Sequence, residues 1–264
     1  MKQPATMYTG PLGSTFHILH ADPETVTALA AIDWNRHFRR VCLDPARGLI
    51  TLMSPSFPHE KLSDFLDDVV EIAGEKIAGR VEALCSTRLR RQGDPSGTGM
   101  EPDCAFYLGE RARDFRVAVA RGVEAVDAFI ERTAPDLVVE VEITNVDASK
   151  TERYAEMGIR ELWRLRSPRK SWEFRAEFLA LRPGCAPRTL DASEVLEGLT
   201  PDDVREAVDG VRDGETRNDR TKAVERVVRR RQDDMVRVRE EAAACSADRA
   251  SQLSSPKIPF EPIC

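Results

Sequence analysis

The chain has 264 residues, of which 41% are hydrophobic, so it can bury one sizeable core and carry appended segments. Its net charge of −6 excludes a global basic field of the kind that draws proteins to nucleic acid. A local basic patch can still exist on a chain with this net charge. The six cysteines include no Cys-x-x-Cys pair, no apolar run reaches transmembrane length, and no signal-peptide pattern is present, which together favour free thiols in a reducing cytoplasm.

The sequence of the first part of the chain predicts a flexible N-terminus, a helix and a short hairpin. Residues 1–22 are rich in Gly, Pro, Ser and Thr, which is typical of a flexible N-terminus. Residues 23–41 are expected to be helical. The turn signal at residues 44–48 then joins Cys42-Leu43 to a short strand over residues 49–53.

An amphipathic helix is predicted over residues 58–78, because apolar side chains recur there at three- and four-residue steps. Glu60 lies in its first turn, where the positive end of the helix dipole by itself favours an acid. His59 is interpreted as a helix-start residue rather than as a catalytic base.

A basic hairpin is predicted next. Residues 81–91 form an expected strand, and the Gly-, Pro- and Ser-rich loop at residues 92–99 joins it to a second strand that opens at Pro102-Asp103. The end of the first strand carries candidate phosphate contacts, although a solvated charge run is the commoner use of such residues. These candidates are Arg88, Arg90 and Arg91.

The most informative stretch is the expected strand over residues 135–144, which follows a helix predicted near residues 117–132. One face is apolar, and the other carries Glu140 and Glu142. Carboxylates in the middle of a Val-rich strand are costly to bury and repel each other, so they call for a cation, and Mg²⁺ prefers such oxygen ligands. The alternative is the solvated face of an edge strand.

A short helix is predicted over residues 148–157, with Asp147 as N-cap and Gly158 as the C-terminal stop. Lys150 lies in its first turn, where a positive charge opposes the helix dipole, so this lysine does not serve helix stability. We therefore expect Asp103, Glu140 and Lys150 to converge at one end of the sheet.

The remaining chain predicts two strands, at residues 159–165 and 171–181, and short helices over residues 191–213. Residues 218–244 carry a weak three-four apolar seam among many charges, which fits either a short coiled coil or a solvated helix beside the main domain. The last stretch, residues 246–264, has the Pro and Ser content of a disordered tail.

These pieces resemble the Uma-two family of restriction-endonuclease-like proteins, a branch of the PD-(D/E)XK nuclease superfamily. The resemblance covers roughly residues 25–182 and depends on the order of its pieces rather than on any single one. The matching residues are Leu52-Met53-Ser54-Pro55-Ser56, His59-Glu60, Glu101-Pro102-Asp103, Pro135 to Val141, Ile143-Thr144, Lys150, Tyr154-Ala155, Gly158 and Glu161-Leu162-Trp163.

The resemblance implies an α/β fold, with a mixed central sheet flanked by helices and a helical C-terminal tail. It implies a nuclease-like domain over residues 23–190 that acts as a metal-dependent endonuclease on DNA. The sequence pattern adds the helical extension over residues 191–245, and we expect a cytoplasmic protein with a homodimer as one assembly. The rival interpretation is a catalytically inactive binding module with the same fold that assembles through its C-terminal helices.

The resemblance also implies roles for single residues. Asp103 and Glu140 are expected to bind Mg²⁺ or Mn²⁺, and Lys150 to orient the water or stabilise the transition state. Glu142 stands where the superfamily usually has the lysine of Glu-x-Lys, so the lysine is expected to have moved to position 150. Glu60 and Glu142 are second-tier candidates for the metal site.

Overall fold

The structure is a computed structural model that describes residues 15–18, 22–30, 40–44, 48–53, 57–85, 87–90, 99–142, 148–167 and 173–253. Within these residues, the main sheet has the strand order β11-β10-β9-β8-β7-β4. Strands β8 and β9 run parallel, and the other neighbours run antiparallel, so the predicted mixed sheet is confirmed. Its strands are β4 (Val81–Ala83), β7 (Cys104–Leu108), β8 (Leu137–Glu142), β9 (Glu161–Arg166), β10 (Arg175–Ala180) and β11 (Arg188–Leu190).

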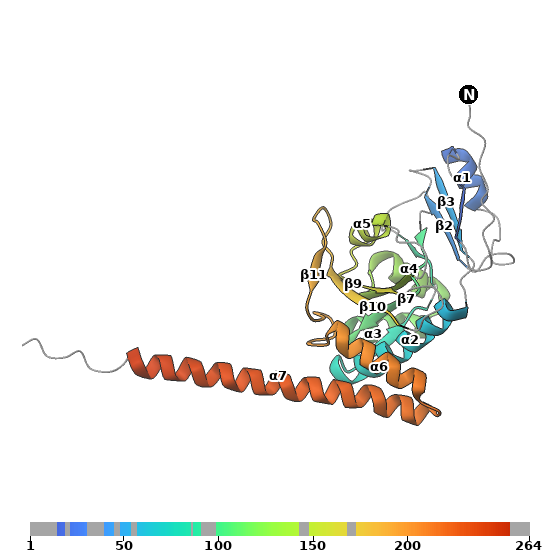
Figure 1. Ribbon diagram of the computed structural model, residues 1–264. Coiled ribbons are helices and arrows are strands. Elements are labelled where there is room, and N and C mark those ends of the chain that lie inside the picture. Colours follow the sequence, from blue (N-terminus) through green and yellow to red (C-terminus); the bar gives the residue numbers. More distant parts are fainter. Residues whose placement is uncertain are drawn as a thin grey trace, which may run out of the picture.

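A second sheet, with the order β1-β3-β2-β6-β5 among the described residues, lies beside the first (Figure 1). Its strands are β1 (Thr15–Ile18), β2 (Arg40–Asp44), β3 (Leu49–Met53), β5 (Leu89–Arg90) and β6 (Gly99–Met100). The predicted pairing across the turn at residues 44–48 is present, with Cys42 opposite Thr51. The helix expected over residues 23–41 does not reach its predicted end, because a strand begins at Arg40; α1 is described over Pro23–Ala30.

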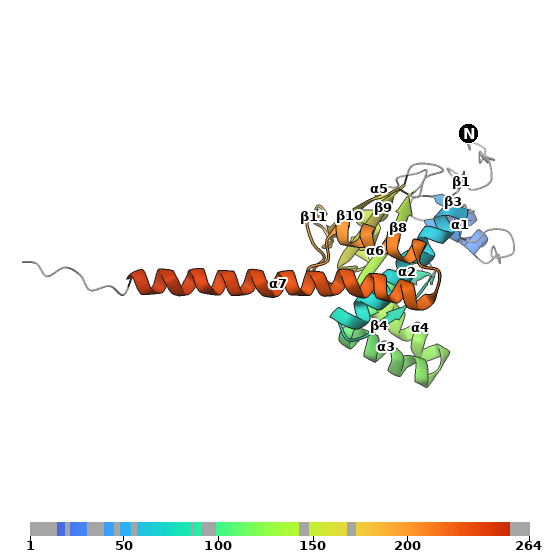
Figure 2. The same cartoon turned by 60° about the horizontal axis from the view of Figure 1, so that its bottom comes forward.

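Helices cover both faces of the main sheet (Figures 1 and 2). Val139 shares a buried cluster with residues of the helices on one face, and Val138 shares another with the helices on the opposite face. The first face is covered by α2 (Phe57–Ile77), α6 (Pro201–Asp213) and α7 (Arg217–Leu253), and the second by α3 (Gly109–Arg121), α4 (Val123–Arg132) and α5 (Ala148–Glu156). Apolar side chains on both sides of β8 are buried because the sheet is covered twice.

Two predicted elements are interrupted. The strand expected over residues 81–91 is split, because the chain turns at Cys85, which has a positive φ of 47°, and leaves the main sheet for the second one. Its first part, β4, pairs with β7, whereas its last part, β5, pairs with β6. The helix expected near residues 117–132 is two helices that break at Gly122, where φ is 107°.

The C-terminal helices belong to the core rather than lying loosely beside it. Val208 of α6 and Val224 and Val228 of α7 are buried in the same cluster as the α2 residues. Beyond them α7 runs past the body of the domain (Figures 1 and 2) and ends at Leu253, so it remains helical beyond residue 246, where the sequence predicted disorder to begin. None of the described helices is long and apolar enough to cross a membrane.

Candidate active site

The centre of the candidate site is a pair of acids on adjacent strands. Cys104, the first residue of β7, pairs with Val139 of β8 in antiparallel register. Asp103 directly precedes β7 and Glu140 directly follows Val139, so the two acids lie next to each other at the end of this ladder. Both acids are buried, with exposed fractions of 3% and 2%. Because β8 lies between β7 and β9, the alternative of a solvated edge strand is wrong.

Asp103 is held by the neighbouring strand and approached by the first turn of α2. The backbone N–H of Val141 donates to Oδ2 of Asp103 over 2.5 Å. Nε2 of His59 lies 3.4 Å from the same oxygen, and Nδ1 of His59 lies 3.7 Å from Oε1 of Glu60. The buried His59 therefore lies between Glu60 and Asp103. Its interpretation as a helix-start residue did not predict this contact with the acid.

Glu140 is held by two side chains of α5. Nζ of Lys150 lies 2.6 Å from Oε2 of Glu140, and the hydroxyl of Tyr154 donates to Oε1. Lys150 and Tyr154 are four residues apart, and this spacing puts both on one face of a helix. Helix α5 lies between the parallel strands β8 and β9 in the chain, and the structure thus brings its Lys150 back to Glu140 of β8. Tyr154 was missed as a site residue, although its spacing from Lys150 was a visible signal.

Glu142 lies in a different environment from Glu140. Nε and Nη2 of Arg164 donate to its Oε1 over 3.1 and 2.8 Å, and Nε of Arg166 donates to its Oε2 over 3.1 Å. Both arginines lie on β9, next to β8. The carboxylate of Glu142 is therefore neutralised by guanidinium groups, and its assignment as a metal ligand stays a prediction. Sequence reasoning did not single out these arginines.

The basic run before the Asp103 strand is described only in part. Both Nε and Nη2 of Arg88 lie within hydrogen-bonding distance of Oε1 of Glu101, at 3.1 and 3.0 Å, two residues before Asp103. The side chain of Arg90 and the whole of Arg91 lie outside the described residues. Phosphate contact by these arginines stays a prediction.

The acid pair fits a divalent cation of the hard type. Within the described residues there is no group of three or more His, Cys, Asp or Glu side chains that could hold a metal ion. Mg²⁺ does not require such a group, since it is commonly held by one or two carboxylates and completes its shell with water and substrate phosphate. Asp103, directly before β7, and Glu140, on β8, are two such carboxylates next to each other at the end of the β7–β8 ladder.

The family of the chain follows from its sequence match. The Uma2 family model, described as "Putative restriction endonuclease", matches residues 36–204, which is more than half of the 264-residue chain. This chain belongs to the Uma2 family. The matched segment contains the acid pair, His59, Lys150 and Tyr154. The Uma2 match stops within α6, so α7 lies beyond it.

Two further comparisons accompany the Uma2 match. No curated protein matches the chain. Among solved structures, the chain is similar to one described as a "putative nuclease belonging to DUF820" from Anabaena variabilis, with 14% sequence identity and a TM-score of 0.39. That match covers 67% of this chain and 88% of the other. At this TM-score, the likeness carries no argument about the site.

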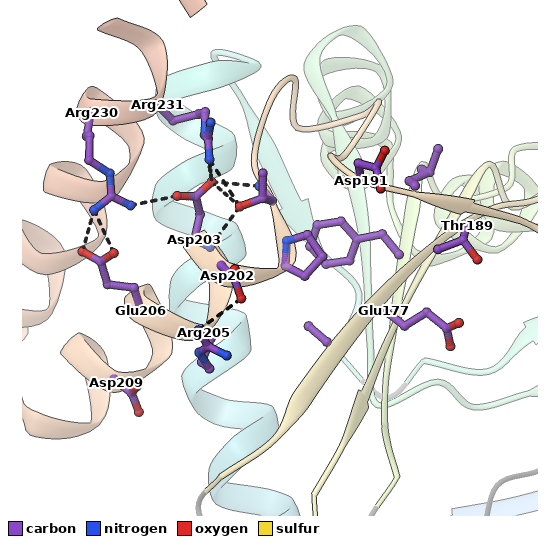
Figure 3. A pocket seen from close by; sticks show the side chains of 15 residues that line it. Glu177, Thr189, Asp191, Asp202, Asp203, Arg205, Glu206, Asp209, Arg230 and Arg231 are labelled. Atoms are coloured by element: carbon purple, nitrogen blue, oxygen red, sulfur yellow. Dashed lines mark hydrogen bonds and ion pairs between the residues drawn. The ribbon is translucent and has the colours of Figure 1, made fainter. Parts of the chain in front are cut away.

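The large pocket shown in Figure 3 is separate from the acid pair. It has a volume of about 980 Å³ and lies between β10, β11, α6 and α7, on the face opposite to that of α5. Its most buried acid, Asp203, is bonded by Arg230 and Arg231 of α7 over 2.8 Å each. These bonds join α6 to α7, so we assign the acids and arginines there to the docking of the last helix.

Proposed function

We propose that the protein is a divalent-metal-dependent endonuclease that hydrolyses phosphodiester bonds in DNA. The observation that supports this most is that Asp103 accepts from the N–H of Val141, the residue after Glu140, while Lys150 is bonded to Glu140. Two acids and one lysine around a strand end is the residue set expected of the nuclease superfamily that the sequence resembles. Membership of a family described as restriction endonucleases supports nucleic acid as the substrate class.

Asp103 and Glu140 would hold Mg²⁺ or Mn²⁺. When bound, such a cation supplies positive charge against the phosphate and lowers the pKa of a coordinated water. The protein's own contribution is to hold both carboxylates in a fixed orientation. The N–H of Val141 fixes one oxygen of Asp103, and Tyr154 fixes one oxygen of Glu140.

Lys150 has two tasks in this proposal. Without substrate its ammonium offsets the charge of the buried Glu140, over 2.6 Å. With a phosphodiester beside Glu140, the same ammonium stabilises the negative charge that grows on the phosphate oxygens. Its side chain is 21% exposed, so it can contact both the buried acid and a ligand that approaches from solvent.

A plasmid-cleavage assay tests the proposal. With Mg²⁺ or Mn²⁺ the protein should nick or linearise plasmid DNA, and a chelator should abolish this. Asp103→Ala and Glu140→Ala should each abolish cleavage and weaken Mn²⁺ binding in a calorimetric titration. Asp114→Ala is the matched control, because Asp114 is an exposed acid of α3. Cleavage by the Asp103→Ala variant at the wild-type rate would end the proposal.

The second candidate function is a binding module that keeps the nuclease fold and assembles through its C-terminal helices. It is favoured by the end of α7, which runs past the domain (Figures 1 and 2), and by Val236 and Val238 of the same helix, which are 53% and 60% exposed. Failure to cut single- or double-stranded nucleic acid under any divalent-ion condition, together with a dimer that Val236→Asp/Val238→Asp abolishes, would select it. A measurement of the molecular mass of the wild type in solution also tests the predicted homodimer.

A further inference from the structure

A buried arginine continues the row formed by the acid pair. In the parallel register of β8 and β9, Glu140 pairs with Arg164, as Val139 pairs with Trp163. Glu140 and Arg164 therefore lie side by side on the same face of the sheet, and Asp103, the residue before β7, lies on the other side of Glu140. Beyond Arg164 the row continues to Glu177 of β10. A guanidinium thus stands next to the proposed metal-binding acids, on the side away from Asp103.

Glu142 orients this guanidinium. Nε and Nη2 of Arg164 both donate to Oε1 of Glu142, so Nη1 is not used in that pair. Burial restricts the pair further, since the Arg164 and Glu142 side chains are 10% and 8% exposed. Arg166 bonds the second oxygen of Glu142, is 46% exposed and lies 3.7 Å from Glu177. Arg164 therefore lies between the buried acids and the surface at Arg166.

We propose that Arg164 contacts the phosphate group that occupies the site beside Glu140, and that Glu142 is the positioning residue that aims it. This inference rests on the proposed function. Glu142 stands where Glu-x-Lys would put a lysine, so in addition to the relocated Lys150 the neighbouring strand supplies a second cation, Arg164. A planar guanidinium with free N–H groups matches phosphate oxygens well and stays charged at every working pH.

The competing explanation is a buried ion pair that only joins β8 to β9. Such pairs add little net stability over a well-packed apolar pair, but breaking one partner alone is costly. The double variant Glu142→Met/Arg164→Met removes both charges without leaving either unpaired, apart from the exposed Arg166. It separates a structural role from a role in substrate contact, because the first requires only packing.

The experiment compares plasmid-cleavage rates of wild type, Arg164→Met, the double variant and the control Arg166→Met. Arg166 bonds the same acid but does not pair with Glu140, so its variant should keep the rate within about threefold. Arg164→Met and the double variant should lose about a hundredfold in kcat, the scale for one transition-state donor, while Mn²⁺ binding is retained. Thermal unfolding should show the double variant folded. A folded double variant with the wild-type kcat would overturn the inference.

Binding of a labelled duplex oligonucleotide in Ca²⁺, followed by fluorescence anisotropy, keeps the two proposals apart. If the wild type binds but does not cut, the hydrolytic function fails on its own. Arg164 is then judged by affinity: a loss of about tenfold in Arg164→Met relative to Arg166→Met supports the inference, and equal affinities overturn it. A wild type that neither binds nor cuts DNA would overturn both.

Discussion

At the scale of single residues, Glu140 shows how a buried acid is held by two donors from one helix. One oxygen accepts from the Tyr154 hydroxyl and the other from the Lys150 ammonium, although Lys150 is ten residues away along the chain. A buried carboxylate without such donors would be strongly destabilised or would take up a proton. Lys150 and Tyr154 therefore satisfy both oxygens of the buried Glu140.

Lys150 can be tested by substitution. Lys150→Ala should lower turnover by roughly two to three orders of magnitude while Mn²⁺ binding survives, because the lysine is not a ligand. Lys150→Arg should recover little, since a planar fork replaces a compact charge. The control is Lys61→Ala, which removes a half-exposed lysine paired with Asp64. An unchanged cleavage rate in Lys150→Ala would refute the relocated lysine.

At the scale of one element, α2 carries an acid, Asp67, whose pKa is raised by burial. Burial raises the pKa of Asp67 to about 6, against a hydrogen bond with Cys104 that lowers it. Because the folded protein binds this proton more tightly than the unfolded chain does, the stabilisation is complete at pH values below the ordinary carboxyl pKa. It is lost as the pH rises through about 6.

Asp67→Asn should therefore raise the unfolding temperature at pH 8 and leave it nearly unchanged at pH 4. The expected gain is roughly 1–2 kcal/mol in the free energy of unfolding, or several degrees. Thermal unfolding at both pH values is the measurement. Asp64→Asn, one turn earlier and largely exposed, should show no such difference. Equal gains at both pH values would contradict the titration of Asp67.

At the scale of the whole molecule, the last helix is fastened to the domain at Asp203 (Figure 3). This residue completes a capping box with Thr200 at the start of α6 and accepts from Arg230 and Arg231 of α7. Burial by itself raises the pKa of Asp203, but these hydrogen bonds outweigh it and hold the pKa below the ordinary value. The contribution of Asp203 to stability is therefore present at neutral pH and lost on acidification.

Asp203→Ala should lower the free energy of unfolding by about 1–3 kcal/mol at pH 7, through the lost cap and charged hydrogen bonds. The deficit should shrink as the pH falls through the native pKa. Hydrogen exchange should accelerate in α7 before it does in β8. Asp202→Ala is the control, because Asp202 is 81% exposed and bonds only the neighbouring Arg205 among its described contacts. Unchanged exchange in α7 would show that apolar packing alone holds the helix.

Local patterns in the sequence were sufficient for the elements that carry the site. The alternation of β8 and the three-four spacing of α2 are repeats of a single element, so they can be seen without knowing any neighbour. The acids at positions 103 and 140 and the lysine at position 150 are visible in the sequence for the same reason, because each is a charged residue where the local pattern does not favour one. The mixed α/β architecture followed from the family resemblance and agrees with the structure.

What only the tertiary structure decided depends on register and packing between distant segments. Arg164 meets Glu142 because β8 and β9 are parallel neighbours in one register, and a shift of one residue would turn Arg164 to the other face. His59 reaches Asp103 only because the start of α2 lies beside β7. The expected strand over residues 81–91 is divided between two sheets for the same reason: pairing partners are set by the fold, and no local period encodes them.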